Sequence, residues 1–361
     1  MKSLLLESII IFISSFLVAK ATIPILSKRS IWLGLIDEPN ARKIHKNPIP
    51  LIGGIAILTG VLFGLMLSQT AQVLIINHLA AVGSTLAIFL IGLWDDRSAL
   101  SPKIRLVIQC SAAIGISLSG IRIESLYGIF GIEILPIYMQ HLITIVIIAG
   151  VTNAFNLVDG IDGLAGSLAL LNVSILAILF IIIGNYGAAF IFIAFIGALI
   201  PFLMANNHPA RIFMGDGGSM VLGFFTALSG IYFIQENTIQ QTVPASLSVL
   251  LISAILIIPV VDALRVFIGR FAKGSSIFTP DKSHLHHLIL YFGINHFLVT
   301  NSILFIELLI VGSTILLFQF YSITAIFILL FTGLIFITKI LKINASLTEW
   351  QQKMKTLEKR K

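Results

Sequence analysis

Long apolar stretches are the feature that most limits how this chain can fold. About eleven runs of near-spanning length follow one another, and short segments between them hold most of the charged residues. A water-soluble domain could not cover its surface with 57% hydrophobic and 11% charged residues. The sequence therefore predicts an all-α, polytopic integral membrane protein. The expected spans are 4–26, 51–69, 74–94, 105–121, 139–158, 164–184, 187–205, 219–234, 246–268, 298–319 and 322–338.

Basic residues indicate the orientation of these spans. Only Lys2 precedes the first span, whereas several basic residues follow it before residue 50. The positive-inside rule therefore places the N-terminus outside and the C-terminus in the cytoplasm. The segment Ala19-Lys20-Ala21 imitates a signal-peptide cleavage site, but the charge pattern favours a retained span. The net charge of +7 reflects this topology and does not indicate nucleic-acid binding.

The chain shows no internal repeat and no separate soluble domain. Residues 1–338 are expected to form a single polytopic membrane domain, followed by a basic cytoplasmic tail over 339–361. The tail holds Trp350 and is typical of a surface helix near anionic lipid. Cys110 is the only cysteine, so the chain cannot form an intrachain disulfide.

Aspartates are distributed unevenly over this predicted topology. All eight lie at or near the predicted cytoplasmic face, whereas the external loops use glutamate. Acids at the ends of separate helices on one face suggest one shared cleft that binds a cation. The alternative is that they merely mark the membrane border. The eight are Asp37, Asp95, Asp96, Asp159, Asp162, Asp216, Asp262 and Asp281.

Asn156, Asp159 and Asp162 follow an apolar run at spacings that share one helical face. Gly160 and Gly163 are expected to end that helix and to let a ligand approach the backbone. Carboxylates at a helix C-terminus lie against the negative end of the dipole, so a nearby cation would offset the repulsion.

Asp95 and Asp96 end another span as a pair, and paired carboxylates repel unless a metal or a base neutralises them. Arg97 alone could do so, and Arg105 is also within reach. Asp216 is flanked by glycines at the start of a further span, where it could hold a metal. The N–H groups of that helix start could meet an anion.

Other polar and aromatic residues lie near these acids. Phe213 is a candidate platform for a flat ring, with core packing as the alternative. The basic loop over 37–50 could hold phosphates or be an ordinary positive-inside loop. Asp262 and Arg265 could be a buried ion pair. The histidines of 284–287 are a weak zinc signal without cysteine, and phosphate or sugar contacts fit them better.

Five sequence blocks occur in a characteristic order between residues 37 and 287. They are DEPNARKIHKNPIPLIGG (37–54), WDDRSALSPKIR (94–105), NAFNLVDGIDGL (153–164), MGDGGS (214–219) and TPDKSHLHH (279–287). Together they resemble the polyprenyl-phosphate N-acetylhexosamine-1-phosphate transferases. Within this family the chain is more similar to the bacterial WecA/TagO branch than to the MraY branch or the eukaryotic dolichyl-phosphate enzymes.

The resemblance implies a reaction at the bacterial inner membrane, with the active site facing the cytoplasm. UDP-N-acetylglucosamine would give its sugar-1-phosphate to undecaprenyl phosphate and release UMP, as the first membrane step towards O-antigen, enterobacterial common antigen or a teichoic-acid linkage. Another UDP-N-acetylhexosamine is the alternative donor. The family requires Mg²⁺, which Mn²⁺ replaces. The partners are these substrates and the bilayer, without nucleic acid; a homodimer is left open.

The resemblance also assigns roles to residues. Asp216 and Asn156 match metal ligands. Asp95, Asp96, Asp159 and Asp162 match catalytic acids. The substrate-binding positions are Lys43, His45, Arg105, Asn206, Phe213, Arg270, His284, His286 and His287. Two departures from the pattern are small: Gly217 stands where threonine or alanine is more usual, and Arg105 replaces a lysine of the MraY branch.

Two other classes of protein also carry acids within spans. An ion-coupled transporter places its site near the membrane midplane, between inverted repeats. These acids lie on one face instead, and no repeat is present. An intramembrane aspartyl protease needs two acids deep within facing spans, and Asp216 lies too near the surface for that role.

Overall fold

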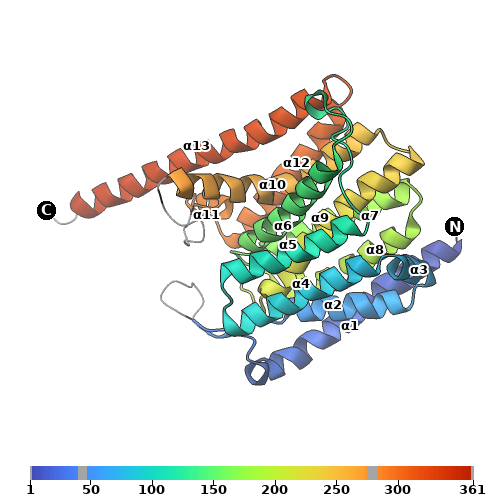
Figure 1. Cartoon of the computed structure of the whole chain (residues 1–361). Helices are drawn as coiled ribbons and strands as arrows, with labels where there is room; N and C mark the ends of the chain where they lie inside the picture. The colour runs from blue at the N-terminus through green and yellow to red at the C-terminus, as the bar shows by residue number, and fades with distance from the viewer. Residues whose placement is uncertain (1, 40–46, 273, 275–282, 359–361) are drawn as a thin grey trace.

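The computed structural model describes residues 2–39, 47–272, 274 and 283–358. The described elements are almost all helices, which gather into one bundle (Figure 1). In chain order they are α1 (Lys2–Leu33), β1 (Ile36–Asp37), β2 (Ile49–Pro50), α2 (Gly53–Met66), α3 (Gln69–Asn77), α4 (Leu79–Ser98), α5 (Pro102–Leu118), the 3₁₀ turn η1 (Ile129–Gly131), α6 (Ile137–Val158), α7 (Leu164–Ile182), α8 (Tyr186–Asn206), α9 (Gly215–Gln240), α10 (Ala245–Ala272), α11 (Leu285–Leu290), α12 (His296–Leu317) and α13 (Ile323–Glu358).

The apolar helices confirm an all-α polytopic membrane protein. Nine described helices are long and apolar enough to cross a membrane, or ten if the bent pair α2 and α3 is one span. Each of the eleven predicted stretches falls on a helix, but α2 has 14 residues and α5 has 17. The count of eleven spans therefore stays a prediction.

Hydrogen bonds to Glu7 hold the break between α2 and α3 in place. The chain bends by 108° between the two helices. The Ser68 hydroxyl donates to the Glu7 carboxylate at 2.6 Å and the Thr70 hydroxyl donates to it at 3.1 Å. Glu7 of α1 therefore satisfies polar groups at the turn where the chain bends.

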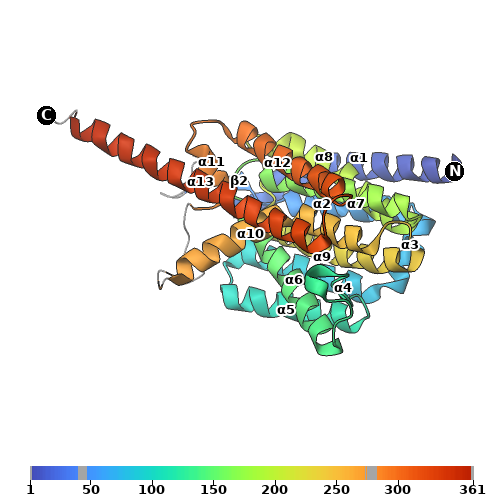
Figure 2. The same cartoon turned by 90° about the horizontal axis from the view of Figure 1, so that it is seen from above.

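Helix α13 crosses the predicted boundary between membrane domain and tail. It continues without a break from Ile323 to Glu358, and its C-terminal half projects beyond the bundle (Figures 1 and 2). The described part of the basic tail is thus an extension of the last apolar helix.

Helix α9 lies at the centre and is the most buried of the long helices. Its first turn packs backbone to backbone against α2 and α4. A Cβ on Gly92 of α4 would lie 2.4 Å from the Gly217 Cα, and one on Gly54 of α2 would lie 2.5 Å from the Gly218 nitrogen. Such contacts between small residues let helices approach closely in a membrane. They bring the end of α4, which carries Asp95 and Asp96, against the start of α9.

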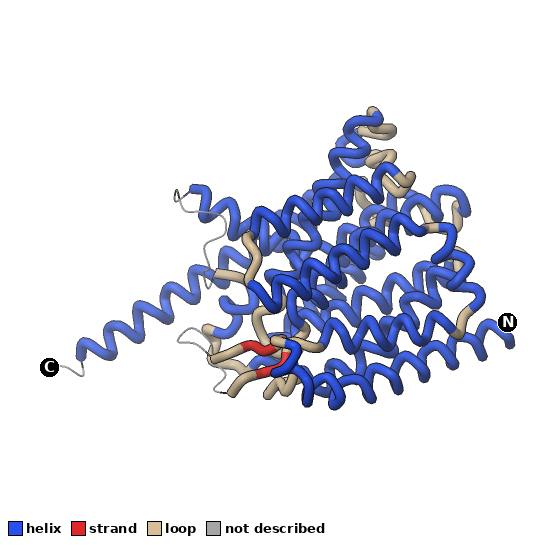
Figure 3. The backbone as a smooth tube through the Cα atoms, turned by 60° about the horizontal axis from the view of Figure 1, so that its bottom comes forward, coloured by secondary structure: helices blue, strands red, loops and turns tan. Residues whose placement is uncertain are grey.

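The acid-bearing helix ends gather at one end of the bundle, which we call the site end. The short hairpin of β1 and β2 also lies there (Figure 3). Phe213 ties the loop before α9 to this hairpin, because its N–H donates to the Pro50 carbonyl at 2.8 Å and its carbonyl accepts from Gly53 at 2.9 Å. Six of the described aspartates lie together on this face, as expected, whereas Asp281 lies outside the described residues. Which side of the membrane that face meets stays a prediction.

Candidate active site

A cleft of about 1110 Å³ opens at the site end. It is lined by six aspartates, one arginine, three histidines and several loop residues. Ten of the sequence-predicted site residues line it: Asp95, Asp96, Arg105, Asn156, Asp159, Asp162, Asn206, Phe213, Asp216 and His287.

Arg105 connects two of the acids. Its guanidinium Nη1 lies 2.5 Å from the Asp95 carboxylate and 3.0 Å from the Asp216 carboxylate. Asp95 is buried and also accepts a hydrogen bond from the Leu100 N–H at 2.6 Å. Among the described residues, Arg105 therefore neutralises the Asp95 carboxylate at this end of α4. Arg97 lies against Gly34 instead.

Asp96 caps the N-terminus of α9. Its carboxylate accepts from the Asp216 N–H at 2.7 Å and from the Gly217 N–H at 3.1 Å. The anion expected at this helix start is therefore the protein's own carboxylate, which is stabilised by free N–H groups and the helix dipole. Gly215 has φ +74°, and a Cβ there would lie 2.6 Å from the Asp96 oxygen, so only glycine fits.

Asn156 approaches Asp216 from α6. Its amide nitrogen donates to the Asp216 carboxylate at 2.8 Å and to the Ser219 hydroxyl at 2.9 Å. Asp216 is about one-third exposed to the cleft. The two residues assigned to the metal by resemblance are thus adjacent, although two helices, α7 and α8, separate them in the chain.

Asp159 follows the last residue of α6 and makes no described side-chain hydrogen bond. Its burial raises the pKa of this carboxyl to about 7, and the negative charges of Asp96 and Asp162 contribute to the increase. The Asp159 carboxyl can therefore exchange a proton near neutral pH.

This pKa predicts a dependence of stability on pH. An ordinary aspartate has a pKa of 3.8, so between about pH 4 and 7 the native state binds the proton more tightly than the unfolded state. The free energy of unfolding then falls as pH rises through this window. We expect Asp159→Asn, melted in EDTA, to lose less stability than the parent between pH 5 and pH 8, by several degrees in Tm. Equal pH dependence of the two proteins would contradict the assignment.

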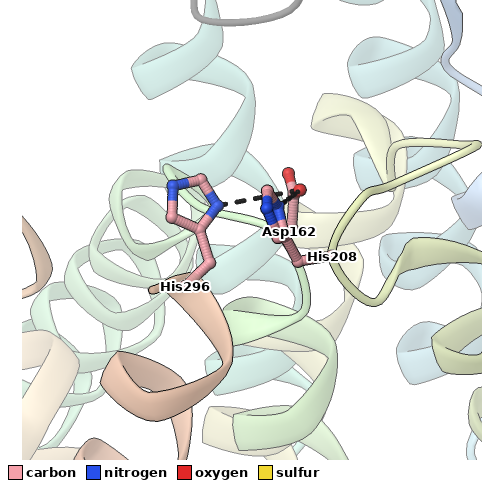
Figure 4. A group of neighbouring side chains, drawn as sticks. All are labelled: Asp162, His208 and His296. Atoms are coloured by element: carbon pink, nitrogen blue, oxygen red, sulfur yellow. Dashed lines mark hydrogen bonds and ion pairs between the residues drawn. The ribbon is translucent and has the colours of Figure 1, made fainter. Parts of the chain in front are cut away.

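The expected shared face of Asn156, Asp159 and Asp162 is wrong. Helix α6 ends at Val158, so Asp162 lies in the loop before α7 and not on the helical face of Asn156, although it lines the same cleft. Its carboxylate meets His208 Nδ1 at 2.7 Å and His296 Nδ1 at 3.7 Å (Figure 4). Burial alone would raise the pKa of Asp162, but the nearby imidazoles of His296 and His208 and the hydrogen bond from the Ala210 N–H lower it.

Gly160 meets a side chain of the protein where a ligand was expected to approach. A Cβ on this residue would lie 2.5 Å from His286 Nε2. His286 is buried, and burial, followed by the charge of His287, lowers the pKa of its imidazole to about 3. This neutral histidine packs beneath the cleft, whereas His287 lines it.

Asn206 joins two loops of the site. Its carbonyl accepts from the Gly163 N–H at 3.0 Å, and its amide nitrogen donates to the Ile212 carbonyl at 2.8 Å. These bonds hold the α6–α7 loop against the segment that leads to Phe213. Phe213 is half-buried at the cleft wall, where a ring face could receive a base.

Asp262 of α10 anchors the segment that carries the histidines. The buried carboxylate meets His284 Nδ1 at 2.8 Å, the Arg265 guanidinium at 2.7 Å and the Leu285 N–H at 2.9 Å. Arg265 also donates to the Ser283 carbonyl. The Asp262–Arg265 pair is thus buried and positions residues 283–287.

Three predicted substrate residues do not line the cleft. They are His284, His286 and Arg270, the last of which is buried near the end of α10 with its guanidinium 5.9 Å from the Phe267 ring centre. Lys43 and His45, predicted to bind substrate, lie outside the described residues.

The donor atoms of the cleft suit a hard divalent cation. Among its described lining residues, six aspartates face a single arginine, and Mg²⁺ and Mn²⁺ prefer carboxylate and amide oxygens. Asp216 and Asn156 would hold the ion once the Asn156 amide turns its oxygen towards Asp216, because an amide nitrogen cannot act as the ligand.

Arg105 would compete with such an ion, since its guanidinium occupies one Asp216 oxygen. We expect Arg105→Gln to lower the Mg²⁺ concentration for half-maximal binding, by roughly tenfold. Arg105→Lys, which keeps the charge, should change it less. Isothermal titration of Mg²⁺ into the three proteins measures this, and unchanged or weaker binding in Arg105→Gln would argue against competition.

Sequence reasoning missed two residues of the cleft, His208 and His296. Each is a single histidine in a loop or at a helix start, with no spacing that connects it to Asp162. Only the folded chain brings them to the same carboxylate.

The chain is similar to known proteins over most of its length. Residues 78–234 match the model of glycosyl transferase family 4. The chain is 34% identical over 267 residues, 72% of its length and 70% of the relative's, to the undecaprenyl-phosphate alpha-N-acetylglucosaminyl 1-phosphate transferase of Escherichia coli (strain K12). It is 33% identical over 295 residues to the enzyme of that name from Salmonella typhi, covering 80% of this chain and 78% of the relative. The chain belongs to glycosyl transferase family 4.

The family 4 match contains the cleft residues on α4, α5, α6 and α9. It includes Asp95, Arg105, Asn156 and Asp216, while the first loop and the 283–287 segment lie outside it. The longer alignments with the relatives extend over more of the chain than the family model does.

Proposed function

We propose that this family 4 protein transfers N-acetylglucosamine-1-phosphate from UDP-N-acetylglucosamine to undecaprenyl phosphate and releases UMP. The names of the relatives support this reaction, and the chemistry of the cleft supports it independently. The observation that carries the proposal is the convergence of Asp95, Asp159 and Asp216 from separate helix ends in one cleft. A soluble nucleotide and a membrane-bound lipid phosphate can meet only at the boundary between the membrane and water.

The chemical difficulty is that donor and acceptor are both negatively charged. When bound at Asp216 and Asn156, Mg²⁺ or Mn²⁺ would supply positive charge to the diphosphate. Arg105 adds a guanidinium at the same place and can donate to phosphate oxygens. His287 faces the cleft, where its imidazole can donate to the diphosphate or the sugar.

The reaction itself needs little proton transfer. The acceptor phosphate, with a second pKa near 6, is largely a dianion. Its oxygen attacks the phosphorus next to the sugar in line, the bond from this phosphorus to the UMP oxygen breaks, and the sugar C1–O bond stays intact. The carboxylates of Asp95 and Asp96 already accept hydrogen bonds within the protein. Asp159 would therefore accept any proton that remains on the acceptor phosphate.

The nucleotide end of the donor fits the other side of the cleft. We place uracil against the Phe213 ring, since a flat base gains from contact with an aromatic face. Asn206 holds the adjoining loops in position rather than contributing a free amide.

We also propose that the site end faces the cytoplasm of a bacterial inner membrane, because the charge asymmetry predicts this and UDP-sugars are made there. Cys110 is the only cysteine, so a Cys110→Ala background permits single-cysteine labelling. A cysteine at residue 98 should resist an impermeant maleimide in intact cells, and one at residue 133 should react. The reverse pattern would overturn the orientation.

The decisive assay combines radiolabelled UDP-N-acetylglucosamine, undecaprenyl phosphate and purified protein, with and without EDTA. Label should enter the lipid fraction only with divalent cation, and UMP should appear in equal amount. A panel of other UDP-N-acetylhexosamines identifies the preferred donor. Phosphorylated protein formed without lipid would instead indicate a covalent intermediate, and no label transfer under any condition would refute the proposal.

A further inference from the structure

Three side chains from three different elements converge at the edge of the cleft, away from Asp216. Asp162 comes from the α6–α7 loop, His208 from the α8–α9 loop and His296 from the start of α12. One ligand atom from each lies within 4.8 Å of the other two. Among the described residues this is the one such group of histidine, cysteine and acidic side chains. Figure 4 shows both imidazoles directed at the same carboxylate.

The contacts leave this group incompletely satisfied. His208 Nδ1 lies 2.7 Å from the Asp162 carboxylate oxygen, which is a good hydrogen bond. His296 Nδ1 is 3.7 Å from that same oxygen and is buried without a hydrogen bond. A buried ring nitrogen without a partner is costly, and a metal ion between it and the carboxylate would supply the partner.

We propose that Asp162, His208 and His296 form a second metal site, selective for zinc-class transition ions, and that the bound ion obstructs the donor nucleotide. Two imidazole nitrogens and one carboxylate oxygen are ligands for Zn²⁺ and Co²⁺, whereas Mg²⁺ prefers oxygen. The oxygen-rich group at Asp216 and this group therefore attract different ions. The obstruction rests on the proposed function, but the metal site does not.

The geometry needs only small adjustments. Zinc binds nitrogen and oxygen at roughly 2.0–2.2 Å, so tetrahedral ligand atoms lie about 3.3 Å apart. The spacing from Asp162 to His208, now 2.7 Å, would open by about 0.6 Å, and that from Asp162 to His296, now 3.7 Å, would close by about 0.4 Å.

The position of the group predicts the consequence of binding. Asp162, His208 and His296 line the same cleft as Phe213 and Asp216. Three protein ligands leave the fourth position of a tetrahedral ion open towards the cleft. A metal fixed there would join the α6–α7 loop to the α8–α9 loop, which carries Phe213, and would narrow the entry path of a nucleotide.

Cobalt titration tests the site without any enzyme assay. Four-coordinate Co²⁺ absorbs visible light strongly, and Zn²⁺ abolishes the signal when it displaces Co²⁺. We expect the purified full-length protein, in detergent and excess Mg²⁺, to bind one Co²⁺ with this spectrum. His208→Gln and His296→Gln should each weaken binding at least tenfold. His141→Gln, which removes a histidine hydrogen-bonded to Ser117, is the matched control and should bind normally.

His208 is largely exposed, so its replacement is compatible with folding even where that of His296 is not. An unchanged cobalt spectrum and affinity in His208→Gln, or no such spectrum in the parent protein, would overturn the proposed site. Full binding in Asp216→Asn is expected, because that residue belongs to the other group.

Inhibition by Zn²⁺ tests the obstruction. Micromolar Zn²⁺ should raise the Kd of UDP-N-acetylglucosamine, measured by equilibrium dialysis, and the same effect should need at least tenfold more Zn²⁺ in His208→Gln. Equal sensitivity of parent and variant would overturn the obstruction. If the protein showed no transferase activity at all, the cobalt spectra would still decide the metal site, so the two proposals can fail separately.

Discussion

Replacement of Asp216 by asparagine is expected to reduce sugar-phosphate transfer by roughly a thousandfold or more. A metal ion and its ligands supply several kcal/mol of transition-state stabilisation in such reactions, and each 1.36 kcal/mol corresponds to a factor of ten. Asp216 is central to the cleft, since Arg105 and Asn156 donate to its carboxylate and its peptide N–H donates to Asp96. The variant keeps the size of the side chain, so its loss of activity reports the missing charge.

The measurement is the initial rate of UMP release at saturating lipid acceptor, over a range of Mg²⁺ and Mn²⁺ concentrations. Glu124→Gln makes the same chemical change in a loop between α5 and α6, and its rate should match that of the parent. Activity of Asp216→Asn within tenfold of the parent at every metal concentration would remove Asp216 from the metal site.

Loss of Asp262 is expected to have the second largest effect, through the position of residues 283–287. Removing one partner of a buried charge pair costs about 3–5 kcal/mol, because the other charge stays buried without compensation. Asp262→Ala would leave Arg265, His284 and the Leu285 N–H without their shared acceptor. The segment should detach from α10, and His287 should leave the cleft wall.

Hydrogen exchange of residues 284–290 measures this detachment directly. We expect protection to fall in Asp262→Ala, to fall less in Asp262→Asn, which retains one acceptor oxygen, and transfer activity to decline in the same order. Glu7→Ala removes another polar anchor, at the bend between α2 and α3, and should leave exchange of this segment unchanged. Normal protection of 284–290 in Asp262→Ala would show that Asp262 does not anchor it.

The positions of the long apolar helices could be predicted from the sequence, because the length of an apolar run is a local property. The same holds for the gathering of acids at one end. Asp95 and Asp216 each stand beside a helix end that the pattern locates, and alternating direction of the spans places those ends together. The glycines at 92 and 217 then bring α4 and α9 into close contact.

The hydrogen-bond partners of individual side chains could not be predicted from the sequence, since they depend on loop conformation. The helical spacing of Asn156 and Asp162 suggested a shared face, but α6 ends at Val158 and the loop turns Asp162 towards His208. Asp96 matched a catalytic acid by resemblance, yet its carboxylate caps a helix 120 residues later in the chain. Local sequence does not specify such long-range hydrogen bonds.

One measurement tests most directly whether the carboxylates at the helix ends hold a cation against the donor diphosphate. Mn²⁺ can replace Mg²⁺ in the purified protein, and pulsed electron–nuclear double resonance detects ³¹P nuclei close to the ion. The account predicts one tightly bound Mn²⁺ per chain that gains ³¹P coupling when UDP-N-acetylglucosamine is added, and neither feature in Asp216→Asn. Mn²⁺ bound equally well by that variant, or bound without ³¹P coupling to the donor, would contradict it.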